Sequence, residues 1–196
     1  DSSTSRGLGD VYKRQISLLL SPFLVFGQNS IAHTPYRQWK VMRQRYLLIH
    51  SYRTDLKTDS LADLIVNSLA ATLPEARARV ARARDAQRVG SLITTGQAML
   101  AVMSAEDATN LYRGTSQFKG LNPGMIRSLL QNEEFFLVAA TDFPTEHAWL
   151  VTSALIHDGV IKNLDLADIS ANAVIPMHSG ALAYANGETF DSVQSD

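Results

Sequence analysis

The sequence of 196 residues contains no cysteine, which excludes a disulfide framework and every thiolate chemistry. Net charge is nearly absent as well, because 18 Lys and Arg residues face 19 Asp and Glu residues, giving a formal charge of −1 at pH 7. This balance provides no long-range attraction to nucleic acid or to an anionic membrane. The Arg residues between Arg77 and Arg88 have no aromatic residues among them and indicate a solvated face. We therefore predict no nucleic-acid partner.

Catalytic motifs are also absent from the sequence. The five histidines (His33, His50, His147, His157 and His178) show no metal-ligand spacing. The chain has neither a nucleophile elbow of the type G-x-S-x-G nor a glycine-rich phosphate loop. We predict a protein that is not an enzyme, with no catalytic residue, no metal and no cofactor.

Long apolar runs are missing, and residues 16–26 (ISLLLSPFLVF) are too short to span a bilayer. Their length suits a signal-peptide core, and Ser30, Ile31 and Ala32 supply a small-x-small cleavage site. We expect residues 16–32 to be a truncated signal peptide or an anchor. The protein is then periplasmic or extracytoplasmic, and membrane-tethered if the segment is an anchor. A buried N-terminal strand is the alternative. Residues 33–196 then form a single domain.

Residues 1–15 are set apart from the fold. Residues 5–15 (SRGLGDVYKRQ) resemble the translation of a sequencing-library adapter. This resemblance implies that the natural protein begins upstream of Ile16, and no fold or function is inferred from these residues.

Apolar patterning alternates between strand and helix along the first half of the domain. A short apolar run at 46–49 predicts a buried strand, and Ser60 with Asp63 predicts a capping box that begins a helix ending near Leu73. A strand is expected next at 77–83, although a helix fits these residues nearly as well. A helix at 85–95, a strand at 98–103 and a helix from Ser104 to Arg113 are expected to follow.

The second half continues with a short helix at 125–131, a buried strand at 135–140, a helix ending near His157 and a last helix at 181–185. This alternation predicts an α/β fold of three layers, with a mainly parallel sheet in the strand order 2-1-3-4. In that order the connections leave strands 1 and 3 in opposite directions, so a crevice is expected between their carboxyl ends.

A small organic anion is the ligand that this crevice would suit. Ser51, Arg53 and Thr54 follow strand 1, and the Arg53 guanidinium can bind a carboxylate through two hydrogen bonds. Ser104 begins the helix after strand 3, and Gln87 lies at the start of the preceding helix. We predict these five residues as ligand-binding residues. The alternative is that Ser104 is only a helix cap and Arg53 only a solvated side chain.

Several segments resemble the TAXI family of TRAP-transporter solute-binding proteins. They read YLLIHSYRTD, RVGSLITTGQAMLAVMSAEDA, FFLVAATDFPTEHAWLVTSAL and IPMHSGALAYANGE. The last segment matches a family closing turn, with Ser179 where the family favours proline. The resemblance implies one lobe of a type 2 periplasmic binding protein, which binds a carboxylate or amino acid and delivers it to TRAP membrane subunits. It adds His178 and Ser179 to the expected ligand-binding residues.

The chain departs from that family in length, because members have a second lobe where residues 113–122 provide only a short loop. A partner, such as a second copy in a homodimer or a TRAP membrane subunit, would then supply the other half of the cleft. Two alternatives remain open. One is a structural or interaction module of a single lobe without a small-molecule ligand, and the other is an intracellular ligand-sensing domain.

Overall fold

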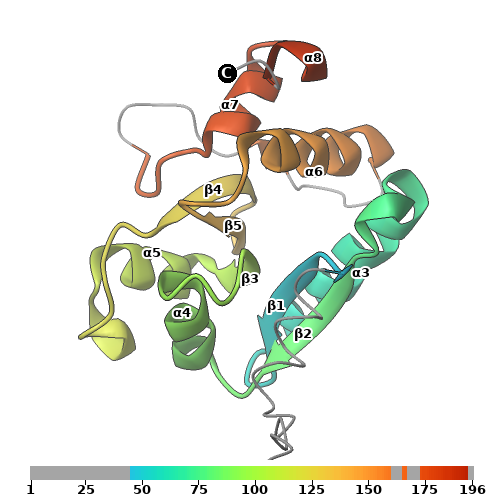
Figure 1. Cartoon of the computed structure of the whole chain (residues 1–196). Helices are drawn as coiled ribbons and strands as arrows, with labels where there is room; N and C mark the ends of the chain where they lie inside the picture. The colour runs from blue at the N-terminus through green and yellow to red at the C-terminus, as the bar shows by residue number, and fades with distance from the viewer. Residues whose placement is uncertain (1–44, 160–164, 167–172, 194–196) are drawn as a thin grey trace, which may run out of the picture. The chain divides into compact units, whose positions relative to one another are not determined.

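The computed structural model of the chain describes residues 45–159, 165–166 and 173–193 (Figure 1). These residues belong to one unit of the chain. The predictions for residues 1–15 and 16–32 lie outside these ranges. Within the ranges, no helix combines the length and the apolar character that crossing a bilayer requires.

A six-stranded sheet forms the centre of this unit, in the order β2-β1-β3-β5-β4-β6. Strand β1 pairs in parallel with β2 and β3, whereas the pairs β3–β5, β5–β4 and β4–β6 are antiparallel. Strands β1 to β4 therefore run in one direction, and β5 and β6 run in the other. The strands are β1 (Leu48–Tyr52), β2 (Arg79–Ala83), β3 (Leu100–Ser104), β4 (Ile126–Gln131), β5 (Phe135–Ala140) and β6 (Asp165–Leu166).

Helices cover both faces of the sheet. Side chains alternate between the two faces along each strand, so strands that are apolar throughout present an apolar surface on both faces. Leu100 and Val102 of β3 pack with α3 and α6, while Ala101 and Met103 pack with α4 and α5. The predicted α/β class with three layers is therefore confirmed. The helices are α3 (Leu56–Thr72), η2 (Pro74–Ala76), α4 (Ala86–Thr94), α5 (Ala105–Arg113), η3 (Ser116–Phe118), α6 (Thr145–Asp158), α7 (Ser179–Ala185) and α8 (Phe190–Val193).

The predicted order 2-1-3-4 is confirmed, with β5 in the fourth position. The strand at 77–83 is confirmed as β2, and the helix from Ser104 to Arg113 is confirmed as α5, with Gly114 in the left-handed conformation at its end. The expected first helix begins earlier than predicted. Asp55 caps α3 by accepting from the Lys57 N–H at 2.9 Å, and Ser60 lies inside the helix, donating to the Leu56 carbonyl.

The prediction of a short helix at 125–131 is wrong, because these residues form β4. The Asn132 side chain accepts from the backbone N–H groups of Glu134 and Phe135 at 2.9 and 2.6 Å. This side-chain turn joins β4 to β5 as an antiparallel hairpin. The hairpin sends β5 back along β3, so β5 ends at the edge of the sheet where β1 and β3 begin.

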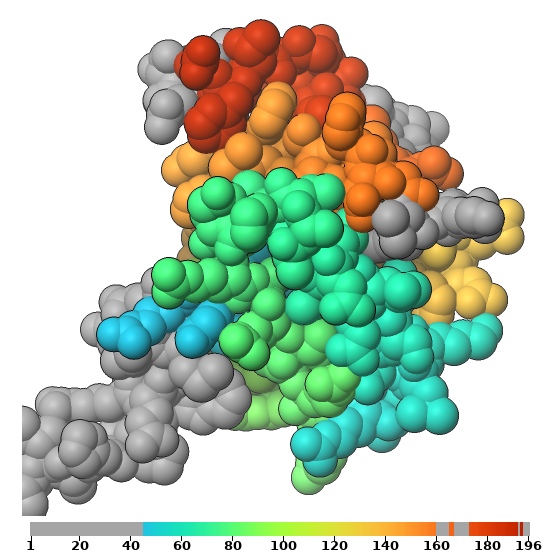
Figure 2. All heavy atoms as spheres, turned by 90° about the vertical axis from the view of Figure 1, so that its right-hand side faces the viewer, coloured from blue at the N-terminus to red at the C-terminus, as the bar shows by residue number. Residues whose placement is uncertain are grey.

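The C-terminal helices pack on α6 rather than on the sheet. In Figure 2, α6 (orange) lies between α3 (teal) and the red helices α7 and α8. The Trp149 ring of α6 contacts Tyr184 and Phe190 at centroid distances of 5.6 and 5.7 Å, and its indole N–H donates to the Glu188 carbonyl. These contacts attach the C-terminal segment to α6, whose first turn borders the pocket described below.

Candidate functional site

The structure brings the five residues predicted from strand ends to one edge of the sheet. Ser51, Arg53 and Thr54 lie at the end of β1, Gln87 lies in the first turn of α4, and Ser104 ends β3. Ser51 is buried, Ser104 is half-buried and the other three are exposed.

Ser104 is engaged in hydrogen bonds within the chain. The Tyr52 hydroxyl accepts from the Ser104 N–H at 3.1 Å and donates to the Asp107 carboxylate at 2.7 Å. The Ser104 hydroxyl in turn accepts from the Asp107 N–H at 3.2 Å, as the N-cap of α5. Burial raises the pKa of Tyr52 well above its usual range, so its hydroxyl stays neutral. The predicted crevice is filled here by the chain's own polar groups.

The helix starts at this edge are occupied by acidic or hydroxyl caps. Asp55 caps α3, Asp85 caps α4, and α5 carries Glu106 and Asp107 in its first turn. Carboxylates at these positions already use the positive ends of the helix dipoles. The residues predicted to bind a ligand therefore lie beside helix starts that the chain itself caps.

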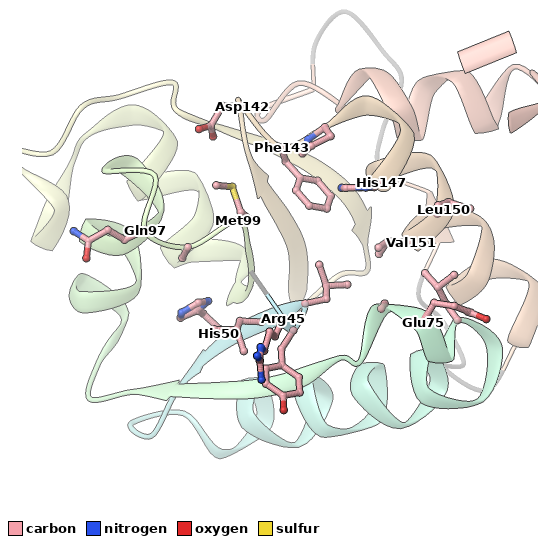
Figure 3. Close-up of a pocket in the computed structure, with 17 residues that line it drawn as sticks. Arg45, His50, Glu75, Gln97, Met99, Asp142, Phe143, His147, Leu150 and Val151 are labelled. Atoms are coloured by element: carbon pink, nitrogen blue, oxygen red, sulfur yellow. The ribbon is translucent and has the colours of Figure 1, made fainter. Parts of the chain in front are cut away.

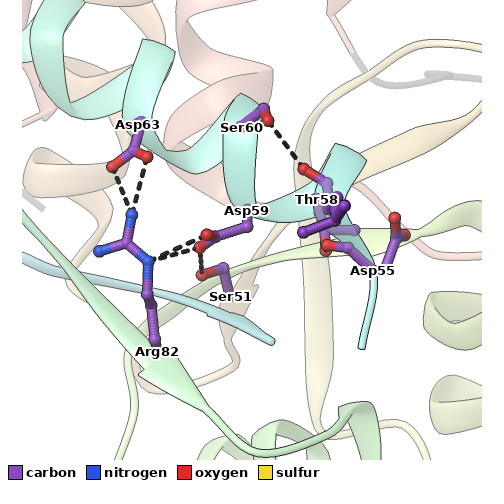
Figure 4. A network of polar contacts seen from close by, with 8 residues as sticks. Ser51, Asp55, Thr58, Asp59, Ser60, Asp63 and Arg82 are labelled. Atoms are coloured by element: carbon purple, nitrogen blue, oxygen red, sulfur yellow. Dashed lines mark hydrogen bonds and ion pairs between the residues drawn. The ribbon is translucent and has the colours of Figure 1, made fainter. Parts of the chain in front are cut away.

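The buried Ser51 belongs to an ion-pair network (Figure 4). Its hydroxyl donates to Asp59 at 2.8 Å, and Arg82 binds both Asp59 and Asp63 at 2.8 and 2.7 Å. Burial raises the pKa of the Asp59 carboxyl, but the hydrogen bonds from Arg82 and Ser51 and the charges of Arg82 and Arg53 outweigh it and lower the pKa. Ser51 and Arg82 thus attach α3 to β1 and β2.

A pocket of about 530 Å³ lies at the opposite edge of the sheet, where β1 and β3 begin and β5 ends. This volume is within the range of small-molecule sites. Apolar side chains form most of its wall. These are Leu47, Leu48, Leu73, Ala76, Ala98, Met99, Phe143, Pro144, Leu150 and Val151.

Charged and polar groups of both signs line the same pocket. Figure 3 shows Arg45 and His50 on one side of it and Phe143 and His147 facing them from α6 and the loop before it. Tyr46, Glu75, Gln97 and Asp142 complete the lining. The buried His50 ring has its Nδ1 at 3.3 Å from the Leu100 carbonyl.

Helix α6 begins at this pocket without a side-chain cap. Its N-cap residue is Pro144, which lines the pocket, and no side chain is recorded accepting from the N–H groups of the first turn. Backbone N–H groups at a helix start, together with the helix dipole, favour a negatively charged group. This helix start therefore lacks the side-chain cap that α3, α4 and α5 have, although Glu146 lies in its first turn.

The two residues suggested by the closing turn lie behind the pocket wall. The buried His178 accepts from the Gly180 N–H at Nδ1 (3.2 Å), so Nε2–H donates to the Phe143 carbonyl at 3.0 Å. Burial lowers the pKa of His178, the Arg127 charge lowers it further, and the Phe143 bond only partly offsets them. The Ser179 hydroxyl lies 2.9 Å from that of Thr145. Both ring nitrogens of His178 are thus engaged within the protein.

Sequence reasoning missed this pocket, although it had placed a helix start after Phe143 and Pro144. The missing information was the direction of β5. Because β5 is antiparallel to β3, the loop after it lies at the amino ends of β1 and β3, away from Ser51 and Ser104. Two adjacent apolar runs joined by Asn132 are the sequence signal that would have indicated this hairpin.

The described residues contain no group of three or more His, Asp or Glu side chains placed to hold a metal ion. No family model, no curated protein and no solved structure matches this chain. The geometry of the pocket is therefore the basis for the function proposed below.

Proposed function

We propose that this chain is a non-enzymatic solute-binding domain that holds a small organic anion in the pocket beside the first turn of α6. The observation that carries the proposal is the uncapped start of α6 at a largely apolar pocket of about 530 Å³. A carboxylate placed there would receive backbone hydrogen bonds and a favourable helix dipole. Arg45 and His147, which also line the pocket, add cationic or hydrogen-bonding groups.

The lining supports a carboxylate with an apolar body, or an amino acid. The apolar wall can cover a hydrocarbon chain or ring, which provides most of the binding free energy. Glu75 and Asp142 are exposed at the same pocket and can accept hydrogen bonds from the ammonium group of an amino acid. Ligands of both kinds belong in the first binding experiments.

The resemblance to TAXI proteins suggests what such binding serves. In this proposal the domain acts outside the cytoplasm and either delivers its ligand to TRAP-type membrane subunits or senses it. A homodimer or a membrane subunit would cover the side of the pocket that this single lobe leaves open.

Isothermal titration with hexanoate, benzoate, succinate, glutamate and leucine tests the proposal. At least one of these ligands should give saturable heat, and Arg45→Ala should weaken a carboxylate by about tenfold, since a charged hydrogen bond contributes about 1.5 kcal/mol or more. The matched control is Arg53→Ala, because Arg53 is exposed at the opposite edge of the sheet.

The outcome separates the proposed function from its rivals. Equal losses from Arg45→Ala and Arg53→Ala would indicate diffuse electrostatic attraction without a specific pocket. No saturable heat with any member of the panel would favour an interaction module without a small ligand.

A further inference from the structure

The turn before α7 is fixed to the sheet by backbone hydrogen bonds. Ser128 of β4 donates its N–H to the Pro176 carbonyl at 3.0 Å and accepts from the His178 N–H at 2.9 Å. Its hydroxyl donates to the Ile175 carbonyl at 3.1 Å. Residues 175–178 thus add a short parallel bridge beside β4, where the register of the β4–β5 pair shifts.

From this fixed turn, His178 reaches the wall of the pocket. It is the only side chain of the turn for which the structure records hydrogen bonds in two directions, to the Gly180 N–H and to the Phe143 carbonyl. Phe143 is buried and lines the pocket, and its ring centroid lies 6.1 Å from those of both His147 and His178.

Helix α7 also lies against the first two turns of α6. A Cβ atom at Gly180 would overlap the Thr145 carbonyl oxygen and come within 2.7 Å of the Trp149 nitrogen. The hydroxyls of Thr145 and Ser179 lie 2.9 Å apart across the same contact. The start of α6, which carries the proposed anion donors, is therefore fixed in place from behind by α7.

We infer that residues 175–180 form a clamp on the pocket wall, and that His178 is a positioning residue that holds Phe143 and the start of α6 in their ligand-binding arrangement. This inference rests on the proposed function, since it concerns the same pocket. His178 acts through Phe143 and does not touch the ligand, because its ring is buried and both nitrogens are engaged.

The clamp gives the pocket a defined response to acid. A protonated His178 ring can no longer accept from the Gly180 N–H, so its side-chain bond to the start of α7 is lost, although Nε2–H can still donate to the Phe143 carbonyl. The ring is then no longer held from both sides. Arg127 from β4 is the charged group that acts on the ring, and its charge opposes protonation, whereas His147 from α6 contacts Phe143. The pKa of His178 in the folded protein lies below its ordinary value of 6.5. The stabilisation that neutral His178 gives the folded protein is therefore complete above about pH 6.5 and is lost as the pH falls through the lowered pKa.

Two substitutions separate the clamp from a simple helix cap. His178→Asn keeps an acceptor for the start of α7, since Asn is a good N-cap, but it is too short to reach the Phe143 carbonyl. His178→Ala removes both hydrogen bonds. The matched control is Ser68→Ala, which removes a buried hydrogen bond of 2.5 Å to Asp158 between α3 and α6, outside the pocket lining.

Hydrogen exchange and hexanoate titration are the measurements. The amides of Phe143 and Ala148, which bond to the Ala140 and Pro144 carbonyls, should exchange about tenfold faster in both His178 variants. The Leu182 amide, which bonds to the His178 carbonyl in α7, should lose protection only in His178→Ala. Hexanoate affinity should fall about fivefold to tenfold in both variants and stay unchanged in Ser68→Ala.

The pH profile provides a readout that a purely structural role would not change. The advantage of the wild-type protein over His178→Asn in hexanoate affinity should be largest at pH 7.5 and should shrink toward pH 5. Comparing the two proteins at each pH cancels the effects of His50 and His147, which line the pocket in both.

Each outcome decides one of the two proposals. If the Phe143 and Ala148 amides exchange at the wild-type rate in His178→Asn, the clamp is overturned. If the wild-type protein binds hexanoate, and His178→Asn exchanges faster at these amides but binds hexanoate equally well, the clamp is also overturned. If the wild-type protein binds neither hexanoate nor the other ligands of the panel while His178→Asn still speeds exchange at Phe143 and Ala148, the mechanical link holds and the proposed function fails.

Discussion

At the residue scale, Gly180 is required by the close approach of two helices. Its α-carbon faces the backbone of α6, where a methyl group would meet the Thr145 carbonyl, the Trp149 nitrogen and Ala148 Cβ, the last two at 2.7 and 2.8 Å. Backbone atoms cannot rotate away as a side chain can, so α7 would have to move. The IPMHSGA segment, for which the resemblance to TAXI proteins predicts a ligand-binding role, has a packing role at Gly180.

Replacing Gly180 by Ala should therefore lower the free energy of unfolding by about 3 kcal/mol in urea denaturation. The control is Gly187→Ala, where φ is 78° but no atom lies within 4 Å of a new Cβ. That variant should lose only about 1 kcal/mol, from backbone strain. Equal losses would show that the helix contact contributes nothing beyond backbone strain.

The Asp59 carboxylate should make stability depend on pH in the acid range. Its hydrogen bonds with Arg82 and Ser51 outweigh its burial and lower its pKa below the ordinary value of 3.8. The stabilisation is therefore present above about pH 3.8 and is lost as the pH falls through the lowered pKa. The stability difference between the wild-type protein and Asp59→Asn, measured by urea denaturation, should shrink from pH 6 to pH 3. A constant difference across that range would contradict this assignment.

At the scale of elements, the sequence predicted helices and strands correctly where local residue patterns determine them. It was misleading where strand direction determines the structure. The helix from Ser104 to Arg113, the strand β2 and the order of four strands were predicted correctly. The hairpin of β4 and β5 was missed, because the apolar residues of 126–131 fit a helix as well as a strand. Only pairing with β5 selects the strand, and pairing is a tertiary effect that a local pattern does not contain.

That one hairpin also explains why the pocket beside α6 was not predicted. The grouping of Ser51, Arg53, Thr54, Gln87 and Ser104 follows from parallel strands and is correct as geometry. Whether such residues are free for a ligand depends on partners elsewhere in the fold, such as Tyr52 for the Ser104 N–H and the α3 residue Asp59 for Ser51. Those partners become known only when the chain is folded.

At the scale of the whole described unit, the sheet carries a separate apolar cluster on each face. One contains α3 and α6 with alternate residues of the strands, and the other contains α4, α5 and η3 with the remaining residues. Neither cluster is complete without the sheet, because each of the strands β1 to β5 contributes side chains to both. Loss of either cluster removes the support of the strands for the other, so we expect unfolding as one cooperative transition.

Leu111→Ala tests this cooperativity. Leu111 is 1 % exposed in the cluster of α4 and α5, so its truncation should cost about 3 kcal/mol. Trp149 lies on the other face, in α6, and is the only tryptophan left once Trp39 is replaced by Phe. In that background, Leu111→Ala should shift the urea midpoint of Trp149 fluorescence as far as that of far-ultraviolet circular dichroism. Leu64→Ala, at a side chain 48 % exposed, should shift neither measurably. A fluorescence midpoint that stays in place while the dichroism midpoint falls would mean that the two faces unfold separately, and that the pocket beside α6 can persist when the layer of α4 and α5 is lost.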